Sequence, residues 1–340
     1  MQKNLFTVIV FLVTTCFSAL SQAEQSTEFM KRTDVEAFVK MMATKHHYNE
    51  RQLNQLLQQS TTQQNILTSI AKPAEKLPWH RYETIFMSPK RVQEGIVFWQ
   101  KHAATLKRAE KEYGVPAEFI VAILGVETFY GKHAGQYKVL DSLITLAFEY
   151  PPRSIFFKSE LEQFLLLARE EKWNPTDIKG SYAGAMGNPQ FIASSYRNFA
   201  VDFTGTGKRD LINSTEDSIG SVANYFKIHG WQKGGPVVLK AKTNGEKFKS
   251  VIASKANPKP ERSLQELTSF GIRAPGKASA TFKNQNFALI SLEGKEGPEY
   301  WLGGQNFYVI TRYNHSDHYA MAVYNLSQKI KAGYQKPKTA

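Results

Sequence analysis

The chain has 340 residues, a formal net charge of +13 and a single cysteine, Cys16. A lone cysteine excludes an intramolecular disulfide, so stability has to come from one large core or two smaller ones. The basic residues are scattered, with no run of five or more, which argues against a nucleic-acid-binding arm and favours either an anionic polymer as partner or a plain solvated surface.

The N-terminal residues 1–23 predict a secretory signal peptide. The stretch 5–12 is almost entirely apolar, and Ser21-Gln22-Ala23 fits the small-x-small pattern of a signal-peptidase site. The apolar run is too short to span a bilayer, and no later segment resembles a membrane span. We therefore expect an exported, periplasmic protein. A lipoprotein acylated at Cys16 stays open as the alternative, although Val13-Thr14-Thr15 lacks the Gly or Ala that such sites prefer before the cysteine.

Residues 33–233 carry the apolar spacing of a mostly helical chain. Ser88 and Pro89 predict the N-cap and first residue of a helix that runs to about Tyr113, and another helix is expected from Ala117 to Tyr130. Two further helix starts are predicted from capping pairs, namely Ser159 with Glu162 and Ser214 with Asp217.

After Trp231 the predicted elements change to strands. These are expected at residues 237–239, 287–292 and 307–311, and a last helix is expected from about Asp317 to Lys331. The predicted fold class is therefore α+β and predominantly α. Its parts are a helical body at residues 24–233, a small β-containing module at 234–300, and a strand with a C-terminal helix at 301–340 that returns to the body.

One carboxylate stands out on the predicted helix 117–130. Its apolar face consists of Phe119, Ile120, Ile123 and Leu124. Glu127 falls on the same face, close to the helix end that Gly131 marks. Burial and the negative end of the helix dipole are both expected to raise the pKa of Glu127, and glycosidic cleavage needs a carboxylic acid that is protonated near neutral pH. A glutamate that pairs with a buried arginine or caps a backbone group fits the same pattern, and the helix alone favours that structural interpretation.

A second feature is the segment from Lys179 to Phe191, which is rich in glycine and other small residues. Such residues let backbone N–H and C=O groups approach a ligand closely. Asn188 and Pro189 predict an N-cap and a first helical residue, which would fix the direction of Gln190. Segments of this kind bind sugars through main-chain contacts, but they are equally common as connectors, so this segment alone leaves both interpretations open.

Four blocks of residues occur in a fixed order along the chain. They are Gly125-Val126-Glu127-Thr128, the glycine-rich residues 180–187, Ser221-Val222-Ala223-Asn224-Tyr225-Phe226 and Arg312-Tyr313-Asn314-His315. Together they resemble the membrane-bound lytic murein transglycosylase B family. The resemblance extends from about Pro78-Trp79 to the final helix, which is most of the chain after the signal peptide.

The resemblance implies a lysozyme-like fold with its cleft in residues 24–233. It also implies cleavage of the MurNAc–GlcNAc β-1,4 bond of peptidoglycan with formation of 1,6-anhydromuramoyl ends. Glu127 matches the family's sole catalytic residue, which acts first as the acid and then as the base. The matching substrate-binding positions are Ser181, Gln190, Asn314, Tyr82, Arg153, Tyr225 and Tyr313. Tyr225 also fits a plain core position, because it lies at helical spacing from Val222.

The implied partner is the glycan strand of peptidoglycan. Cell-wall synthesis or division complexes stay open as further partners, nucleic acid is not expected, and a monomer is expected. No second acidic residue with an obvious role is found in the four blocks, whereas a hydrolase of the lysozyme type uses two carboxylates. This lack agrees with a reaction in which the muramoyl C6 hydroxyl, rather than water, is the nucleophile.

Asp202 begins a stretch similar to the start of an EF-hand loop, with side-chain oxygens at alternating positions and glycine at the sixth. The resemblance implies a calcium ion held by Asp202, Thr204, Thr206, Lys208 and Asp217. Thr206 stands where an acidic residue is usual, and Lys208 brings a cation beside the site, so binding should be weak. We expect that no cofactor is required, and a structural calcium ion stays open.

Two other functions remain as alternatives. A zinc-dependent peptidoglycan amidase or peptidase would need a His/Asp ligand set, but His315 and His318 have no third partner at a suitable spacing. A non-catalytic wall-binding scaffold would have no need of the acid at Glu127.

Overall fold

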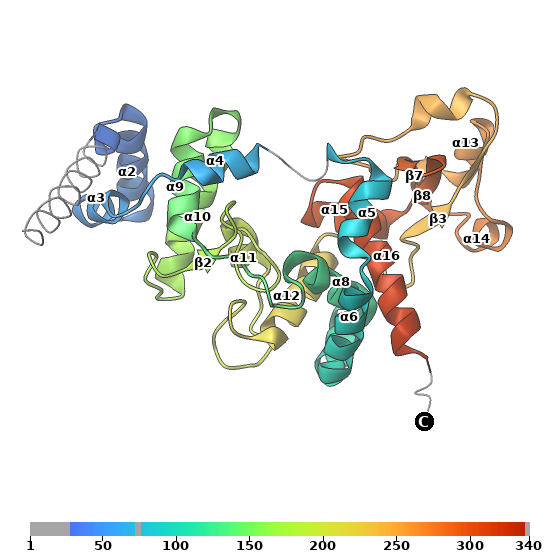
Figure 1. Cartoon of the computed structure of the whole chain (residues 1–340), viewed down its shortest axis with the longest axis horizontal. Helices are drawn as coiled ribbons and strands as arrows, with labels where there is room; N and C mark the ends of the chain where they lie inside the picture. Colours follow the sequence, from blue (N-terminus) through green and yellow to red (C-terminus); the bar gives the residue numbers. More distant parts are fainter. Residues whose placement is uncertain (1–27, 72–75, 337–340) are drawn as a thin grey trace, which may run out of the picture. The chain divides into compact units, whose positions relative to one another are not determined.

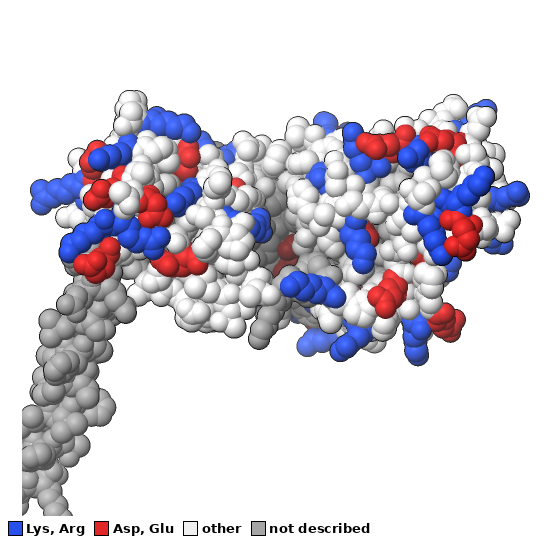
Figure 2. Space-filling model, turned by 90° about the horizontal axis from the view of Figure 1, so that it is seen from above, with Lys and Arg blue, Asp and Glu red and all other residues white. Residues whose placement is uncertain are grey.

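The computed structural model describes residues 28–71 and 76–336, so the predicted signal peptide and Cys16 lie outside the described residues (Figure 1). The described chain divides into two compact units. Unit 1 holds residues 28–71, 135–185 and 192–194, and unit 2 holds residues 76–134, 186–191 and 195–336. Lys and Arg side chains are interspersed with Asp and Glu on the face shown in Figure 2, as their scattered positions in the sequence predict.

Unit 1 is built mainly from helices. They are α2 (Thr33–His46), α3 (Glu50–Gln58), α4 (Gln64–Ile70), α9 (Val139–Glu149), the 3-10 turn η2 (Pro151–Arg153) and α10 (Ser154–Glu170). A short antiparallel ribbon joins β1 (Tyr137–Lys138) to β2 (Lys179–Gly180). The buried core of the unit lies between α9 and α10.

The capping pair predicted at Ser159 and Glu162 is wrong, because α10 already begins at Ser154. The turn at Pro151–Arg153 sets this earlier start, and Ser159 lies inside the helix. The Glu162 carboxylate instead receives Lys45 Nζ at 2.8 Å and His46 Nε2 at 2.7 Å. Glu162, which the sequence pattern assigns to a helix cap, therefore takes part in an ion pair between α10 and the end of α2.

Unit 2 contains the remaining helices and the larger sheet. The helices are α5 (Trp79–Phe86), α6 (Pro89–Lys101), α7 (Ala103–Tyr113), α8 (Ala117–Thr128), α11 (Ala193–Phe199, whose first two residues belong to unit 1), α12 (Thr215–Ile228), α15 (Gln305–Tyr313) and α16 (Asp317–Tyr334). The Ser88 and Ser214 caps are confirmed, since their hydroxyl groups accept from Arg91 N and Asp217 N. The helix predicted from Pro89 to Tyr113 is interrupted at His102 and forms two helices.

The strand-rich module of unit 2 carries its own small core. Its elements are β3 (Val238–Lys240), β4 (Lys242–Thr243), η3 (Lys247–Val251), β5 (Arg262–Ser263), α13 (Leu264–Ser269), β6 (Ile272–Arg273), α14 (Gly276–Thr281), β7 (Asn286–Gly294) and β8 (Gly297–Gly303). The four-stranded sheet has the order β3-β8-β7-β5, and β4 pairs with β6. Phe248, Phe287 and Leu302 are among the buried side chains of this core.

The strand predicted at residues 287–292 is confirmed as part of β7, but the strand predicted at 307–311 is wrong. Those residues lie in α15. Phe, Tyr, Val, Ile and Thr favour strands by propensity, yet tertiary packing overrides such preferences. In the helix, Phe307 and Ile310 lie one turn apart and are both fully buried, and Phe307 lies against Gly303 at the end of β8.

The site of unit 2 is positioned by α8, which is apolar around most of its circumference and almost wholly buried. A helix of that kind belongs in the centre of a core. Helix α16 runs antiparallel to it, because Lys331 near the C-terminus of α16 bonds Glu118 at the start of α8 (2.7 Å), whereas Tyr319 at the start of α16 bonds Glu127 near the end of α8. The pairing brings the first turn of α16 to the C-terminal end of α8.

Candidate active site

Glu127 lies in the last turn of α8, as the sequence predicts, but it is half-buried rather than buried. The hydroxyl group of Tyr319 donates to Glu127 Oε1 at 2.5 Å. A hydrogen bond to a charged acceptor is short and stronger than one between neutral groups. Tyr319 is only 2% exposed, so the bond fixes one oxygen of the carboxyl group from the protein side.

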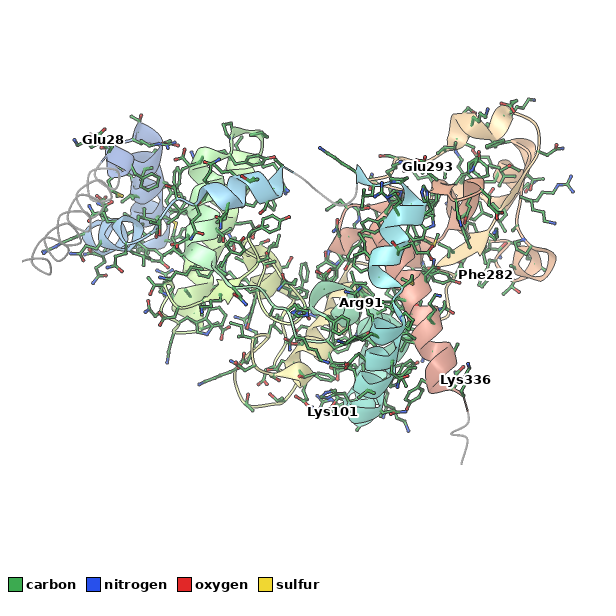
Figure 3. The ribbon with its side chains drawn as sticks, in the orientation of Figure 1. Glu28, Arg91, Lys101, Phe282, Glu293 and Lys336 are labelled. Carbon is green, nitrogen blue, oxygen red and sulfur yellow. The ribbon has the colours of Figure 1, made fainter. Side chains whose placement is uncertain are left out.

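The chain leaves α8 through a strained turn. Phe129, Tyr130 and Gly131 all have positive φ, at 53°, 63° and 89°. Bulky residues adopt this left-handed region only at a cost, and such strain often accompanies functional sites. The turn is held because Thr128 Oγ1 accepts from Gly131 N at 2.9 Å and because the Tyr130 hydroxyl donates to Arg91 O at 2.8 Å. Arg91, labelled in Figure 3, also places its guanidinium group over the Phe129 ring, at 5.1 Å from the centroid.

The turn from Met186 to Phe191 packs on the same helix end. No helix begins at Asn188, so the predicted N-cap is wrong; residues 187–190 form turns closed by an antiparallel bridge between Met186 and Phe191. The peptide group of Asn188 is used differently, because its carbonyl oxygen accepts from Thr128 Oγ1 at 2.9 Å. The structure therefore ties the glycine-rich segment directly to the residue that follows Glu127.

Gln190 belongs to this turn and has a positive φ of 53°. Its side-chain amide donates to Ala134 O and to Gly187 O, both at 3.0 Å. These two bonds orient the amide group, which leaves its oxygen as an acceptor for a ligand.

Three tyrosines pack beside Glu127 in unit 2. The rings of Tyr313 and Tyr319 are stacked with 6.4 Å between centroids, and Tyr225 meets Tyr313 edge-on at 4.9 Å. The Tyr313 hydroxyl donates to Pro189 O at 2.6 Å, and the Tyr225 hydroxyl donates to Arg312 O at 2.5 Å. Burial, and then the charge of Glu127, hold the pKa of Tyr313 and Tyr319 well above the ordinary tyrosine value. These two phenols therefore stay protonated and act as donors.

Tyr82, also predicted to bind substrate, is only 2% exposed. Its ring packs against Trp79, Phe86 and His318 at 6.4, 5.3 and 5.6 Å. This placement suits a supporting role better than direct contact with a sugar.

Asn314 is half-buried in the extended link between α15 and α16, where its carbonyl oxygen accepts from Ser316 N at 2.7 Å. Ser316 then caps α16 by accepting from Tyr319 N. The same cap thus fixes both Asn314 and Tyr319. Tyr319 was not predicted from the sequence, although a serine cap three residues before an aromatic residue is a signal that could have located it.

Ser181 and Arg153 belong to unit 1. Ser181 Oγ accepts from Ala185 N at 3.0 Å and from Ala183 N at 3.3 Å, so its hydroxyl proton is available to donate. Arg153 is exposed, and its guanidinium group lies 4.3 Å from the centroid of the Phe156 ring.

The EF-hand-like loop of unit 2 is held together by two carboxylates. Asp202 accepts from Thr204 Oγ1 and from the backbone N–H groups of Gly205, Thr206 and Gly207, at 2.6 to 3.0 Å. Desolvation opposes its ionisation, but the bonds from Gly207 and Thr206 lower the pKa of Asp202 below its usual value. Asp217, which is 1% exposed, accepts three further backbone N–H groups.

The oxygen atoms of this loop fit a calcium ion only weakly. Thr204 Oγ1 lies 3.0 Å from Asp202 Oδ1 and 3.2 Å from Thr206 Oγ1. Two of these three oxygen atoms belong to neutral hydroxyl groups, which bind calcium less strongly than a carboxylate does. Lys208 is exposed beside them. Within residues 28–71 and 76–336, no three His, Cys, Asp or Glu side chains gather as ligands for a metal ion.

The chain is similar to known proteins in sequence and in structure. The family model of the transglycosylase SLT domain matches residues 30–328. Membrane-bound lytic murein transglycosylase B of Escherichia coli (strain K12) is 41% identical over 313 residues, which are 89% of this chain and 84% of that protein. The structure of catenated lytic transglycosylase SltB1 from Pseudomonas aeruginosa is 47% identical, with a TM-score of 0.84 over 90% of this chain and 99% of that chain. Escherichia coli lytic transglycosylase Slt35 in complex with calcium is 40% identical, with a TM-score of 0.81 over 91% of this chain and 96% of that chain.

All three relatives are named for lytic transglycosylase activity, which decides against the amidase and the scaffold considered above. The predominantly helical α+β fold class is confirmed, and it is shared with these lysozyme-like enzymes. The chain therefore belongs to the transglycosylase SLT domain family and is a lytic transglycosylase of peptidoglycan.

Proposed function

We propose that Glu127 is the single acid–base residue of this enzyme and that cleavage of the MurNAc–GlcNAc bond leaves a 1,6-anhydromuramoyl end. The observation that carries the proposal is the bond from the buried Tyr319 hydroxyl to Glu127 Oε1 (2.5 Å). It holds a half-buried carboxyl group at the end of α8, beside residues that the family resemblance predicts to bind the sugar.

In the first step, Glu127 donates a proton to the glycosidic oxygen. Because Oε1 accepts the Tyr319 hydroxyl, the proton to be transferred sits on Oε2. The substrate's own 2-acetamido carbonyl stabilises the sugar C1 atom as the bond breaks. No second protein carboxylate is needed for that role, which a lysozyme-type hydrolase assigns to a second acid.

In the second step, the Glu127 carboxylate takes the proton of the muramoyl C6 hydroxyl, and that oxygen bonds C1. One residue thus returns to its starting state after acting as acid and then as base. The Tyr319 hydroxyl supports the intervening carboxylate, because a donor stabilises the ionised form of its acceptor.

We further propose, from the family resemblance, that Ser181, Gln190, Arg153, Asn314 and Tyr313 bind the sugars of the substrate. We assign Tyr225 and Tyr82 a supporting role in the packing of the site rather than direct contact with the sugars, which is consistent with their burial. If calcium is bound, Asp202, Thr204, Thr206, Lys208 and Asp217 would hold it weakly, and it would stabilise the loop without taking part in the reaction.

We also propose that the protein is exported by the signal at residues 1–23 and works on the periplasmic cell wall as a monomer. No helix within residues 28–71 and 76–336 is long and apolar enough to cross a membrane. Acylation at Cys16 would attach the same catalytic chain to a membrane, and a mature N-terminus determined by mass spectrometry distinguishes the two forms.

The experiment that tests the assignment is Glu127→Gln, measured by release of soluble fragments from purified glycan. The amide keeps the shape and the bond from Tyr319 but cannot donate and then accept a proton, so the rate should fall by a factor on the order of 10² to 10⁴ or more. Glycan binding and thermal unfolding should change little. Glu94→Gln, which removes a charge paired with Lys132, is the control and should keep full activity. Robust turnover by Glu127→Gln would show that another group is the acid.

A further inference from the structure

The turn after α8 has to be held against a more relaxed conformation. Phe129 and Tyr130 lie next to each other in the left-handed region, with φ of 53° and 63°. Residues with a Cβ atom enter that region only at a cost, and here two do so in succession. The relaxed alternative is a right-handed continuation of α8, in which Gly131 N would bond Glu127 O instead of Thr128 Oγ1. The side chain of Tyr130 is placed to prevent that continuation.

The ring of Tyr130 fits a space that two buried glycines leave open. Gly125 of α8 faces the ring, and a Cβ atom added there would come within 2.6 to 2.7 Å of its Oη, Cε1 and Cζ atoms. Gly95 of α6 faces the hydroxyl group, and a Cβ atom added there would lie 2.5 Å from Oη. A larger residue at either position would displace the ring. This space, the glycine slot, therefore holds Tyr130 between α6 and α8.

The slot also directs the hydroxyl group of Tyr130. It donates to Arg91 O in the first turn of α6 at 2.8 Å, and the ring lies 5.6 Å from that of Phe98 on the same helix. Burial raises the pKa of Tyr130 above the ordinary tyrosine value, against the charge of Arg91, so the group stays protonated and donates. Tyr130 N donates to Leu124 O at 2.9 Å. One residue thus joins the end of α8 to α6 through both its backbone and its side chain.

Helix α16 meets α6 beside the slot. A Cβ atom added at Gly95 would lie 2.6 Å from Ile330 Cδ1, and one added at Gly333 would lie 2.3 Å from Ile96 Cδ1. These two contacts bring α6 and α16 closer together than larger residues would allow. Because the donor to Glu127 belongs to α16, the same packing that seats Tyr130 also places that donor.

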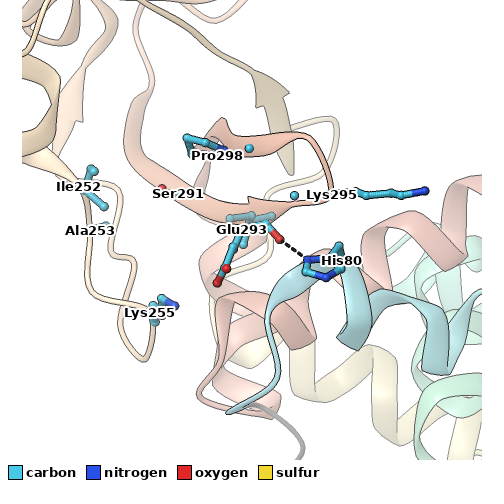
Figure 4. A pocket seen from close by; sticks show the side chains of 11 residues that line it. His80, Ile252, Ala253, Lys255, Ser291, Glu293, Lys295 and Pro298 are labelled. Atoms are coloured by element: carbon cyan, nitrogen blue, oxygen red, sulfur yellow. Dashed lines mark hydrogen bonds between the residues drawn. The ribbon is translucent and has the colours of Figure 1, made fainter.

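The pocket of about 650 Å³ beside the β7–β8 hairpin lies apart from the slot (Figure 4). It is bounded by α5, the hairpin and the segment 252–255, and His80 Nδ1 lies 3.3 Å from Glu293 O at its edge. None of the described residues of α6, α8 or α16 lines it. Ser291→Ala in its wall therefore serves as a control remote from Glu127.

We propose that Tyr130 is a positioning residue: seated in the glycine slot, it keeps the turn left-handed and so holds the Glu127 carboxyl group against the Tyr319 hydroxyl. The inference rests on the proposed function, since it takes Glu127 as the acid–base residue. Tyr130 acts through the backbone of α8, whereas Tyr319 bonds the carboxyl group itself. Weakening either support should therefore affect the same protonation step.

The first test is Tyr130→Phe in the full chain, which keeps the ring and removes the hydroxyl group. Loss of one neutral hydrogen bond shifts an equilibrium by about 3- to 10-fold, so kcat for fragment release from purified glycan should fall by about that factor with KM unchanged. A weaker Tyr319 donor favours protonated Glu127, so the alkaline limb of the pH–rate profile should move to higher pH. Tyr313 and Tyr319, which face Glu127, stay protonated over this range and do not contribute to the limb. A residue that only stabilises the fold would lower the Tm and leave the limb in place.

Gly95→Ala tests the slot from its other wall. The added methyl group would lie 2.5 Å from Tyr130 Oη and displace the ring, so kcat should fall by about 10- to 100-fold, as expected for a small misplacement of a reacting group. Adding Tyr130→Phe removes the atom in the way, so the double variant should be faster than Gly95→Ala alone. Gly333→Ala is the matched control, because its methyl group meets Ile96 rather than Tyr130. It should keep the parent kcat and pH profile even where its Tm falls, and Ser291→Ala should keep all three.

A double variant tests whether Tyr130 acts through the bond from Tyr319. In Tyr319→Phe the donor is already absent, so adding Tyr130→Phe should move the alkaline limb no further. Shifts that simply add would contradict an action through that bond and would overturn the proposal.

Parent-like kcat and pH profiles in both Tyr130→Phe and Gly95→Ala would also overturn it. A Gly333→Ala enzyme as impaired as Gly95→Ala would do the same, because the loss would then come from the contact between α6 and α16. If the Tyr130 variants behave like the parent while Glu127→Gln is inactive, the positioning role fails and the catalytic assignment stands. Robust turnover by Glu127→Gln would instead remove the proposed function itself.

Discussion

Replacing Tyr319 with Phe should slow the reaction without unfolding the site. The change removes the hydroxyl group that donates to Glu127 Oε1 at 2.5 Å and keeps the ring that stacks on Tyr313. Because the side chain is 2% exposed and Phe is almost the same size, no large cavity forms and water does not readily replace the lost donor.

The size of the effect follows from the type of bond. A hydrogen bond to a charged group contributes about 1.5–3 kcal/mol, and each 1.4 kcal/mol is a factor of ten, so kcat should fall by about 10- to 150-fold. KM should change little, because Tyr319 acts through Glu127 rather than by touching the sugar. Loss of a donor to the carboxylate also favours its protonated form, so the alkaline limb of the pH–rate profile should move to higher pH.

The assay is the steady-state release of soluble fragments from purified glycan across a range of pH. Tyr324→Phe makes the same change on the same helix, at a residue to which no role in the site is assigned; it is the matched control and should keep parent-like rates and the parent pH profile. The reasoning would be refuted by a Tyr319→Phe enzyme with an unchanged kcat and an unshifted profile.

Three further predictions concern the frame of the site. Burial raises the pKa of Asp317 from 3.8 to about 6, so the folded chain holds this proton more tightly than the unfolded chain does. The free energy of unfolding should therefore fall by about 3 kcal/mol in all as pH rises from well below 4 to well above 6, and Asp317→Asn should flatten that slope in urea unfolding curves. Thr128→Val leaves Asn188 O and Gly131 N without their partner and should cost about 2 kcal/mol of stability together with part of the activity, measured by denaturation and fragment release. Millimolar calcium should hardly change the Tm of the parent chain. Thr206→Asp should add an ion-dependent stabilisation of up to about 2.7 kcal/mol if the calcium concentration reaches 100 times the Kd of the site. A large increase in the Tm of the parent chain at micromolar calcium would contradict a weak site.

Much of the helical frame could be predicted because it is encoded locally. Ser88 before Pro89, and Ser214 three residues before Asp217, fix helix starts through neighbours in the sequence. Residues 307–311 were mispredicted for the opposite reason. Their propensity favours a strand, but the buried environment beside Gly303 selects a helix, and that environment is assembled from distant residues.

The position of Glu127 near the end of its helix could be predicted from the sequence, and its proposed catalytic role follows from the family resemblance, but the hydrogen-bond partner of its carboxyl group could not be predicted. Tyr319 lies 192 residues after Glu127, and no local pattern joins them. The turn at Asn188 shows the same limit: it resembles a helix cap, yet its carbonyl group is taken by Thr128, 60 residues earlier. Partners of this kind depend on how α8, α16 and the turn pack together.

The central claim is that a sugar hydroxyl group, rather than water, attacks C1. A tethered hydroxyl held near the reacting carbon competes with water through an effective concentration that can reach about 10⁵ M or more. Digestion of purified glycan in oxygen-18 water, followed by mass spectrometry of the products, tests this directly. We expect 1,6-anhydromuramoyl ends without heavy oxygen and no new reducing ends. Heavy oxygen at most of the new ends would mean hydrolysis, and it would contradict the proposed mechanism even if Glu127 proved to be the acid.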